Sequence, residues 1–235
     1  MQVYAAMVDR VDQGIGRILE KLRELGVLEN TLILFASDNG ASHQSVEIGE
    51  GEIGCLSRYS SQQQDWANVS NTPFRLYKTY PYEGGINTPL IAFWPEGISE
   101  PGRIEDVPVH FIDFLATFVE LTGAAYPPET VPRSVHPLAG VSFADVLRNN
   151  TQPRNRLLFW KWRGGEALFD GRYKLVRFKS PEWEVYDTDL NRTETQQLRD
   201  GASLLRSRYS KVYDKWLETA PIPPGPLPDE IPEKR

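Results

Sequence analysis

Residues 30–40 read NTLILFASDNG, and this stretch decides how the rest of the chain is interpreted. Its first part, Thr31–Ala36, is short, rich in branched and aromatic residues and almost entirely apolar. Such a run is typical of a strand that is buried on both faces of a parallel sheet. Asp38 and Asn39 follow directly, at the carboxyl end of the predicted strand, which is where open α/β sheets place their ligands.

The segment before this strand has the pattern of an amphipathic helix that Gly26 ends. A helix that feeds a strand is half of a βαβ unit, yet the strand that should precede the helix is missing. We therefore expect an incomplete amino-terminal edge, and the sequence leaves open whether Met1 is the natural start or the chain is truncated. Apolar residues recur at steps of three and four at Tyr4, Met7, Val11, Ile15, Ile18, Leu22 and Leu25.

The segments after the Asp-Asn pair continue the α/β pattern up to about residue 147. Residues 41–73 show no sustained period, which favours a functional surface loop or disorder. A turn at Glu83–Gly85 precedes a second buried-type strand at Leu90–Trp94. Val109–Leu121 reads as a mostly buried helix, and a helix-like segment follows at Phe143–Leu147.

Beyond a proline-rich segment at 127–137 the pattern changes to hairpins. Asp170-Gly171 is a type I′ turn dipeptide between two apolar runs. A last helix is expected around Leu205–Trp216, and the prolines after it cannot continue it. The expected strands are Leu157–Trp160, Ala167–Phe169, Tyr173–Val176 and Trp183–Tyr186. The expected domains are an α/β part at 1–147, a small antiparallel subdomain with a helix at 148–220, and a proline-rich tail at 221–235.

Composition excludes several classes of protein. The 235 residues carry 26 Lys and Arg against 32 Asp and Glu, so the net charge is −6 and there is no general attraction for nucleic acid. No apolar run approaches the roughly 18 residues of a membrane helix. The single cysteine, Cys55, excludes an internal disulfide. We expect neither nucleic acid nor membrane as a partner.

Two places in the sequence could take part in binding or catalysis, and each also has a purely structural interpretation. Asp38 and Asn39 are hard oxygen donors of the kind that Ca²⁺ and Mg²⁺ bind, although such a pair more often caps or turns the chain. Calcium takes about 6–8 oxygens, so two residues cannot complete a site. Lys78 could stabilise charge that develops on an oxyanion, although a lysine read without context is usually solvated. His43, in the loop, is more often a surface residue.

Several motifs follow one another along the chain in a defined order. They are 4–25, 30–40, FRLYK at 74–78, EGGI at 83–86, PLI at 89–91, HFID at 110–113 and GRYKLV at 171–176. In this order, up to about Leu198, the chain resembles the carboxyl-terminal half of an arylsulfatase, a formylglycine-dependent sulfatase of the alkaline-phosphatase-like superfamily.

The resemblance implies a fold, a site and an activity. The fold is α/β, part of an alkaline-phosphatase-like sheet domain with a small antiparallel α+β carboxyl-terminal subdomain. Asp38 and Asn39 would ligate a divalent cation, usually Ca²⁺, and Lys78 would contact the sulfate. The activity would be hydrolysis of sulfate esters, on a sulfated small molecule or glycan, by a metal-assisted formylglycine nucleophile. The family implies a periplasmic, secreted or lysosomal location.

The departures from the family pattern concern the nucleophile. Relatives carry an Asp-Asp pair and a Cys-x-Pro/Ala-x-Arg motif nearer their amino terminus, and neither is present here. Cys55 lies after the Asp-Asn pair and is followed by Leu-Ser-Arg-Tyr, so it is not the formylglycine precursor. The family histidine around 160–167 is also absent. We expect the chain alone to be inactive and the amino-terminal half to be its partner. The alternatives are a phosphate or phosphonate ester hydrolase and a noncatalytic fragment or partner subunit.

Overall fold

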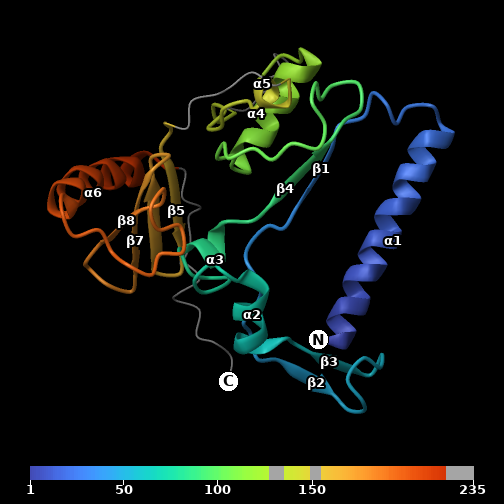
Figure 1. The fold of residues 1–235 in the computed structure, drawn as a ribbon, viewed down its shortest axis with the longest axis horizontal. Helices are drawn as coiled ribbons and strands as arrows, with labels where there is room; N and C mark the ends of the chain where they lie inside the picture. The colour runs from blue at the N-terminus through green and yellow to red at the C-terminus, as the bar shows by residue number, and fades with distance from the viewer. Residues whose placement is uncertain (127–134, 149–154, 221–235) are drawn as a thin grey trace. The chain divides into compact units, whose positions relative to one another are not determined.

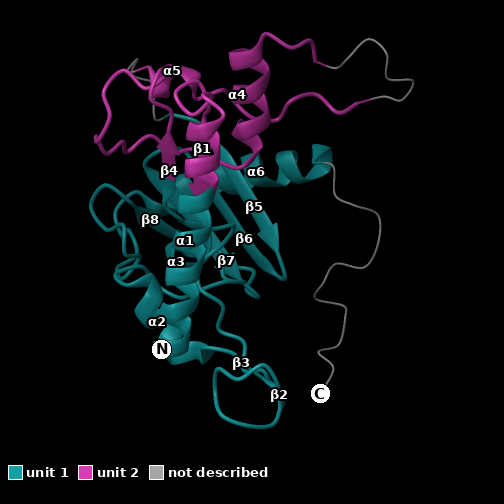
Figure 2. Cartoon of the chain, turned by 90° about the vertical axis from the view of Figure 1, so that its right-hand side faces the viewer, with its two compact units in different colours: residues 1–17, 36–90, 155–235 teal, residues 18–35, 91–154 magenta. Residues whose placement is uncertain are grey.

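The computed structural model describes residues 1–126, 135–148 and 155–220 (Figure 1). These residues form two compact units (Figure 2). One comprises Met1–Arg17, Ala36–Leu90 and the described part of Asn155–Arg235; the other comprises Ile18–Phe35 and the described part of Ile91–Arg154. The proline-rich tail and most of the 127–137 segment lie outside the described residues, and the boundary at 147 stays a prediction.

The first helix forms where its period predicts it, as α1 (Gln2–Glu24). It nevertheless buries no residue: Met7 is 62% exposed and Val11 53%. Its apolar stripe is therefore a surface of the described chain. None of the described helices combines the length and the apolar composition that crossing a membrane requires.

The two predicted α/β strands are present as β1 (Ile33–Ala36) and β4 (Leu90–Phe93), which pair in a two-stranded sheet. The expectation that they are buried on both faces is wrong, because Phe35 is 48% exposed and Ile91 60%. Among the described strands each has only the other as its neighbour. Two strands alone provide too little surface to cover each other's apolar side chains.

Two helices follow β4. The first is α4 (Ile112–Thr122), which forms within the predicted helical segment and ends at Gly123 with a φ of 65°. Only Asp113, Ala116 and Thr117 of α4 are buried, so the expectation of a mostly buried helix is wrong. The second, α5 (Ala144–Leu147), packs beside α4 at the position of the predicted helix-like segment.

The 41–73 segment is more regular than predicted. It contains the antiparallel strands β2 (Glu47–Gly49) and β3 (Arg58–Ser60), followed by α2 (Gln63–Asn71). Polar side chains hold the hairpin: the Glu47 carboxylate accepts hydrogen bonds from Ser60 Oγ at 2.5 Å and from an Arg58 nitrogen at 3.1 Å. Because these contacts are polar, the strands carry no apolar period that a sequence reading could detect.

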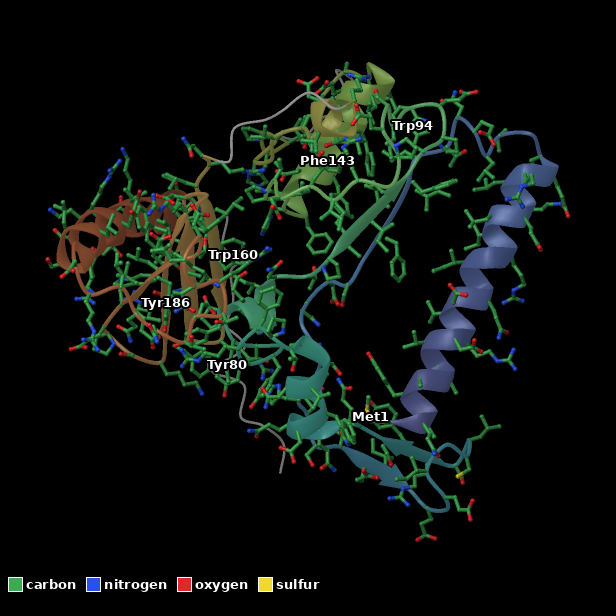
Figure 3. The ribbon with its side chains drawn as sticks, in the orientation of Figure 1. Met1, Tyr80, Trp94, Phe143, Trp160 and Tyr186 are labelled. Atoms are coloured by element: carbon green, nitrogen blue, oxygen red, sulfur yellow. The ribbon has the colours of Figure 1, made fainter. Side chains whose placement is uncertain are left out.

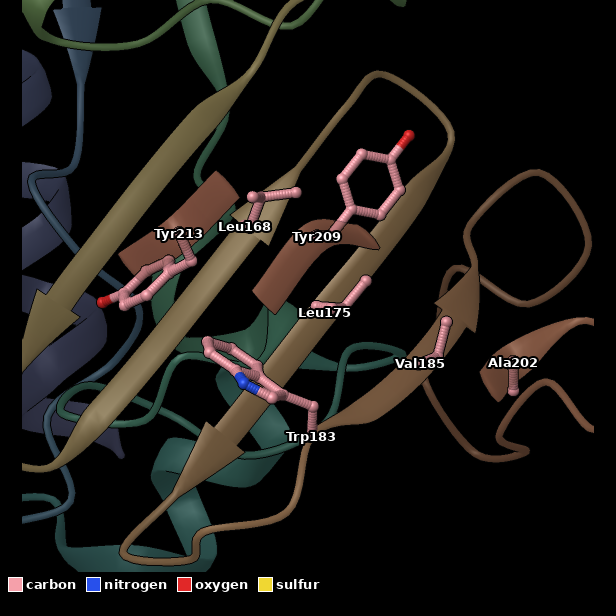
Figure 4. Close-up of a cluster of buried hydrophobic side chains, with 7 residues drawn as sticks. All are labelled: Leu168, Leu175, Trp183, Val185, Ala202, Tyr209 and Tyr213. Carbon is pink, nitrogen blue, oxygen red and sulfur yellow. The ribbon is translucent and has the colours of Figure 1, made fainter. Parts of the chain in front are cut away.

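The predicted carboxyl-terminal hairpins are confirmed as one antiparallel sheet in the order β5-β6-β7-β8, with α6 (Ala202–Thr219) on one face. Side chains from the sheet and α6 form a buried cluster (Figure 4). The strands are β5 (Leu158–Trp162), β6 (Gly165–Phe169), β7 (Tyr173–Phe178) and β8 (Glu184–Asp187). The cluster consists of Leu168, Leu175, Trp183, Val185, Ala202, Tyr209 and Tyr213.

The turn between β6 and β7 differs from the predicted type I′ turn on Asp170-Gly171. The Asp170 amide donates to the Tyr173 carbonyl at 3.1 Å, which places Gly171 and Arg172 in the centre of the turn. Type I′ requires positive φ at both central residues, whereas only Gly171, at 100°, has it. The Asp170 carboxylate accepts from the Tyr173 amide at 2.6 Å and fixes this alternative.

The opposite face of the sheet is covered by the chain around α3 (Glu83–Ile86). Alternation along β7 separates the two faces, since Leu175 packs with α6 whereas Val176 packs with Tyr82. Tyr80, Trp160 and Tyr186, labelled in Figure 3, also belong to this second cluster. The segment that contains Lys78 and the predicted turn thus rests on the carboxyl-terminal sheet.

Candidate functional site

Asp38 and Asn39 lie in the loop that follows β1. Ser37 Oγ donates to the Asn39 carbonyl at 2.8 Å, and Asn39 Nδ2 donates to the Gly40 carbonyl at 3.0 Å. Since Nδ2 acts as the donor, Oδ1 is the Asn39 atom that can ligate a cation. Asp38 is exposed and Asn39 is half-buried. The loop therefore offers two oxygen-bearing side chains at the end of the strand, as predicted.

Gly40 brings this loop into backbone contact with α3. Its amide donates to the Gly85 carbonyl at 3.0 Å. A Cβ at Gly40 would lie 1.7 Å from the Gly84 carbonyl oxygen, far inside van der Waals contact. Only glycine allows so close an approach, which gives the DNG and EGG motifs a shared physical reason.

Lys78 is brought to the same loop by its backbone. Its amide donates to the Ala41 carbonyl at 3.0 Å. Asn71, at the end of α2, joins the two segments further: its Oδ1 accepts from the Ala41 amide at 3.0 Å, and its Nδ2 donates to the Leu76 carbonyl at 2.9 Å. The structure thus places the Asp38–Ala41 and Leu76–Lys78 backbones together, while the direction of the Lys78 ammonium stays a prediction.

Sequence reasoning assigned no role to two residues of this neighbourhood. His43, for which a surface position is the more frequent one, is half-buried and stacks on Tyr77, with ring centroids 4.5 Å apart. Asn71 bridges two segments, yet in the sequence it is an ordinary polar residue at a helix end. Neither role has a local signal, because each depends on residues brought near by folding.

Asp38 and Asn39 supply only part of the ligands that a divalent cation needs. Asp38 and Asn39 supply side-chain oxygens, which suit Ca²⁺, but calcium takes about 6–8 ligands. Across residues 1–126, 135–148 and 155–220, no group of three or more His, Cys, Asp or Glu is arranged to hold a metal. The pair fits a cation as part of a coordination shell and cannot complete one.

Cys55 does not fit the role of a formylglycine precursor. It is exposed in the connection between β2 and β3, where its Sγ lies 3.2 Å from Ser57 Oγ. This hydrogen bond lowers the pKa of the Cys55 thiol. The residues that follow it do not match the modification motif, and its contacts lie within its own hairpin.

A buried ion cluster fixes the segment after Lys78. Lys174 on β7 is 1% exposed, and its Nζ lies 2.7 Å from Glu83 Oε1 on α3 and 2.7 Å from Glu194 Oε1. Glu194, in the chain after β8, is fully buried. Sequence reasoning missed all three, because they are far apart in the chain and each reads as a surface charge.

Comparison with known proteins identifies the family. The sequence model of the sulfatase family matches residues 1–124, more than half of the chain. The chain belongs to the sulfatase family. A second model, N-sulphoglucosamine sulphohydrolase, C-terminal, matches residues 74–212. The sulfatase resemblance predicted from the motifs is thereby confirmed.

One curated relative agrees with this sulfatase assignment, and two solved structures share the fold. An uncharacterised sulfatase of Schizosaccharomyces pombe is 31% identical over 92% of this chain and 42% of its own length. A solved Pseudoalteromonas sulfatase has a TM-score of 0.66 at 22% identity, covering 94% of this chain and 44% of its own. A protein solved with its substrate D-glucosamine-2-N,6-O-disulfate has a TM-score of 0.59 at 21% identity, covering 92% and 39%.

The comparisons also define the extent of the match. This chain spans less than half the length of each of these sulfatase relatives and structural neighbours. The fold is α/β of the alkaline-phosphatase-like class, with a small antiparallel carboxyl-terminal subdomain, as predicted.

Proposed function

We propose that this chain is part of a sulfuric ester hydrolase in which Asp38 and Asn39 hold a divalent cation and Lys78 binds the sulfate group. The observation that carries the proposal is the hydrogen bond between the Lys78 amide and the Ala41 carbonyl. It keeps a lysine beside the loop that bears the two oxygen donors. Membership of the sulfatase family supports the same assignment.

The chemistry of a sulfate ester explains why such a pair is useful. Its non-bridging oxygens are negative, and charge grows on them and on the leaving oxygen as the ester bond breaks. A bound cation, calcium by family resemblance, would polarise these oxygens as a Lewis acid. Lys78 would hold the anion and stabilise the same charge through a fixed ammonium. Both positive groups must contact one small anion, because water screens charges at a distance.

The nucleophile is the part of the proposal that this chain does not supply. Cys55 does not fit the formylglycine precursor, so no step is derived through that group. We propose that the complete catalytic unit includes a further polypeptide segment, on the same chain or a partner, and that this chain alone does not turn over substrate. The exposed apolar side chains of β1 and β4 support this proposal.

The substrate is proposed at the level of a chemical class. One structural neighbour takes a disulfated glucosamine. We propose a sulfated small molecule or sulfated glycan for this chain. The periplasmic, secreted or lysosomal location stays a proposal from family resemblance.

Ligand-dependent stability of the purified chain tests the binding roles. A partial site with a Kd on the order of 1 mM would stabilise the fold by about 1.4 kcal/mol in about 10 mM Ca²⁺. We expect Asp38→Ala to abolish this calcium effect and Lys78→Ala to abolish the added effect of inorganic sulfate. Glu52→Ala, an exposed carboxylate in the β2–β3 connection, is the control. Equal calcium effects in the Asp38 and Glu52 variants would contradict the metal assignment.

Kinetics test the catalytic role and the reaction class. The chain alone should leave 4-nitrophenyl sulfate and 4-nitrophenyl phosphate intact; turnover that survives Cys55→Ala would contradict the absence of a nucleophile. In a catalytically complete enzyme that contains this chain, Lys78→Ala should lower kcat/KM for the sulfate ester by roughly 10²–10³. A change within twofold would return Lys78 to a solvated lysine. Preferred hydrolysis of the phosphate would favour the phosphate ester hydrolase.

A further inference from the structure

We propose that the carboxyl-terminal sheet positions the candidate site, and that Lys174, Glu83 and Glu194 are its positioning residues. The inference rests on the proposed function for the meaning of the site, but the mechanical coupling is a property of the described chain. The cluster fastens α3 to the sheet, and α3 in turn holds the Asp38–Ala41 loop and the Lys78 segment.

The cluster is built into the interior of the sheet face. Lys174 lies on β7 between Tyr173 and Leu175, whose side chains point toward α6, so its own side chain points to the opposite face. There its Nζ makes two contacts of 2.7 Å, one with each carboxylate. With Lys174 1% exposed and Glu194 fully buried, water cannot replace either partner.

Glu194 also binds the backbone of α3. Its Oε2 accepts from the Glu83 amide at 2.7 Å, at the first residue of this short helix. The Glu83 carboxylate contacts Lys174 through Oε1, and its Oε2 accepts a hydrogen bond from Asn87 Nδ2 at 2.8 Å. Lys174 and Glu194 therefore fix α3 through its main chain and through the Glu83 side chain, which defines both its position and its orientation.

The charges in the cluster make it sensitive to the loss of one member. It contains two carboxylates and one ammonium. Burial lowers the pKa of Lys174, but Glu83 and Glu194 outweigh this effect and raise it above its ordinary value, which keeps the ammonium charged. Burial raises the pKa of Glu194. Without Lys174, two carboxylates would face each other with no cation between them, and their repulsion, or the uptake of a proton that relieves it, would weaken the attachment of α3 to the sheet.

Movement of α3 would reach both parts of the candidate site. The Gly85 carbonyl accepts from Gly40, directly after the Asp38-Asn39 pair, and the Gly84 amide donates to the Arg75 carbonyl at 2.9 Å. Arg75 begins the segment that leads to Lys78. Each contact joins one side of the site to α3 through the backbone, so displacement of α3 would strain the hydrogen bond between Lys78 and Ala41 that holds the two sides together.

A second set of contacts fastens the Arg75 end of the segment to the same sheet. An Arg75 nitrogen donates to Tyr186 Oη at 3.1 Å and to the Glu194 carbonyl at 3.2 Å. Its guanidinium lies 4.3 Å from the centre of the Tyr82 ring, and Tyr82 Oη donates to Glu184 at 2.7 Å. The Lys78 segment is therefore attached to the sheet on both sides of Lys78.

Amide hydrogen exchange on the full chain tests this coupling without requiring activity. The reporters are the Gly40 and Lys78 amides, which make the bonds to Gly85 and Ala41. We expect Lys174→Met to speed exchange at both by about tenfold or more, while the amides of β6 and β7 stay protected. The control is Lys161→Met, which removes an ion pair with Glu166 in the same sheet (Nζ to Oε1, 2.6 Å).

Further variants separate positioning from general packing. In Lys174→Met with Glu194→Gln the excess buried charge is reduced, so exchange at Gly40 and Lys78 should return part of the way toward the unmodified chain. If Lys174→Met does not fold, Glu83→Gln keeps the side-chain shape and should show the same pattern more weakly. Unchanged exchange at both reporters, or equal loss of protection throughout the sheet, would overturn the proposal.

The same measurements distinguish this inference from the proposed function. Loss of protection at Gly40 and Lys78 combined with no effect of calcium or sulfate on stability would retain the coupling and reject the sulfatase site. Full protection in Lys174→Met, combined with the expected ligand effects, would reject the coupling and retain the site.

Discussion

At the scale of single residues, the junction between the Asp38–Ala41 loop and α3 requires glycines, which have no Cβ. Gly40 faces the Gly84 carbonyl, and a Cβ at Gly84 would itself lie 2.2 Å from the Leu76 carbonyl oxygen. Three backbone segments therefore meet without any side chain between them. A methyl group at this point must displace main chain, which is costlier than displacing a flexible side chain.

Gly40→Ala should consequently destabilise the chain by about 1–3 kcal/mol or more, the scale for overpacking a well-packed site. Urea denaturation of the purified chain measures this free energy. The control is Gly14→Ala in α1, where a Cβ would meet nothing within 4 Å and where alanine should stabilise the helix by about 0.5–1 kcal/mol. A stability within 0.5 kcal/mol of the unmodified chain for Gly40→Ala would contradict the close approach.

Arg172 and Asp187 form a residue pair with a defined dependence on pH. Arg172 Nη2 lies 2.7 Å from Asp187 Oδ2, and Asp189 Oδ2 lies 3.9 Å from the same guanidinium. The hydrogen bond from Arg172 lowers the pKa of Asp187. Because the folded pKa is below the unfolded value of about 3.9, this stabilisation is present above that value and is lost as pH falls through the folded pKa.

Arg172→Met should therefore lower the free energy of unfolding near neutral pH, and the difference from the unmodified chain should shrink as the solution is acidified. Urea titrations at several pH values between 7 and 3 provide the comparison. A difference that grows on acidification would show that the pair does not stabilise the ionised carboxylate.

At the scale of elements, both faces of the β5–β8 sheet are packed, because successive side chains along each strand point to opposite faces. On one face, Tyr213 of α6 is fully buried and its hydroxyl donates to the Trp160 carbonyl at 3.0 Å. Its ring meets Trp183 with centroids 5.0 Å apart and Trp216 with centroids 5.3 Å apart. The packing of α6 thus centres on one aromatic residue.

Tyr213→Ala should cost about 3–5 kcal/mol, the range for removing a buried aromatic ring. Since small domains have about 5–15 kcal/mol in total, thermal unfolding should move to markedly lower temperature. Leu204→Ala on the same helix, where the side chain is 73% exposed, should change stability by less than about 0.5 kcal/mol. Equal effects of the two substitutions would show that α6 does not pack through Tyr213.

Sequence reasoning succeeded where the signal is local. The period of α1, the apolar run of β1 and the alternation of the carboxyl-terminal strands each lie within one element and could be recognised directly. It failed for β2 and β3, whose pairing depends on polar side chains, and for the β6–β7 turn, where the Asp170 side chain decides between two arrangements. Resemblance to the sulfatase motifs indicated Asp38, Asn39 and Lys78 as site residues, and their roles stay predictions.

The long-range part of the site could not be predicted from the sequence. Lys174 and Glu83 are 91 positions apart in the sequence, and each is of a residue type that usually lies on the surface. Lys174 shares its face of the strand with the apolar Val176, so the alternation along the strand does not decide whether the lysine is exposed or covered. Only the fold shows that this face is covered.

At the scale of the whole molecule, large apolar side chains remain exposed on several described elements. They include Met7 and Val11 on α1, Phe35 on β1, Ile91 on β4 and Phe118 on α4. Apolar side chains that share one exposed stripe, as Met7 and Val11 do on α1, mark a site of contact or aggregation.

The purified chain should accordingly enhance the fluorescence of the apolar dye ANS while its far-ultraviolet circular dichroism shows folded structure. Val11→Glu should reduce this dye binding by placing a charge on the α1 stripe. Gln13→Glu adds the same charge at a polar position of that helix and should leave dye binding unchanged. Equal reductions in both variants would attribute the effect to net charge and reject the apolar stripe as the dye site.

The attachment of the Lys78 segment on both sides has a consequence for the thermodynamics of the anion binding that we propose for Lys78. The main chain around Lys78 is ordered when the protein folds, so binding should restrict only the rotamers of one long side chain, at most about 2 kcal/mol at 25 °C. Calorimetry of sulfate binding should then show a small entropic penalty. If the cluster around Lys174 is broken, the same capture must also order a loop, and the penalty should rise while the binding enthalpy changes little.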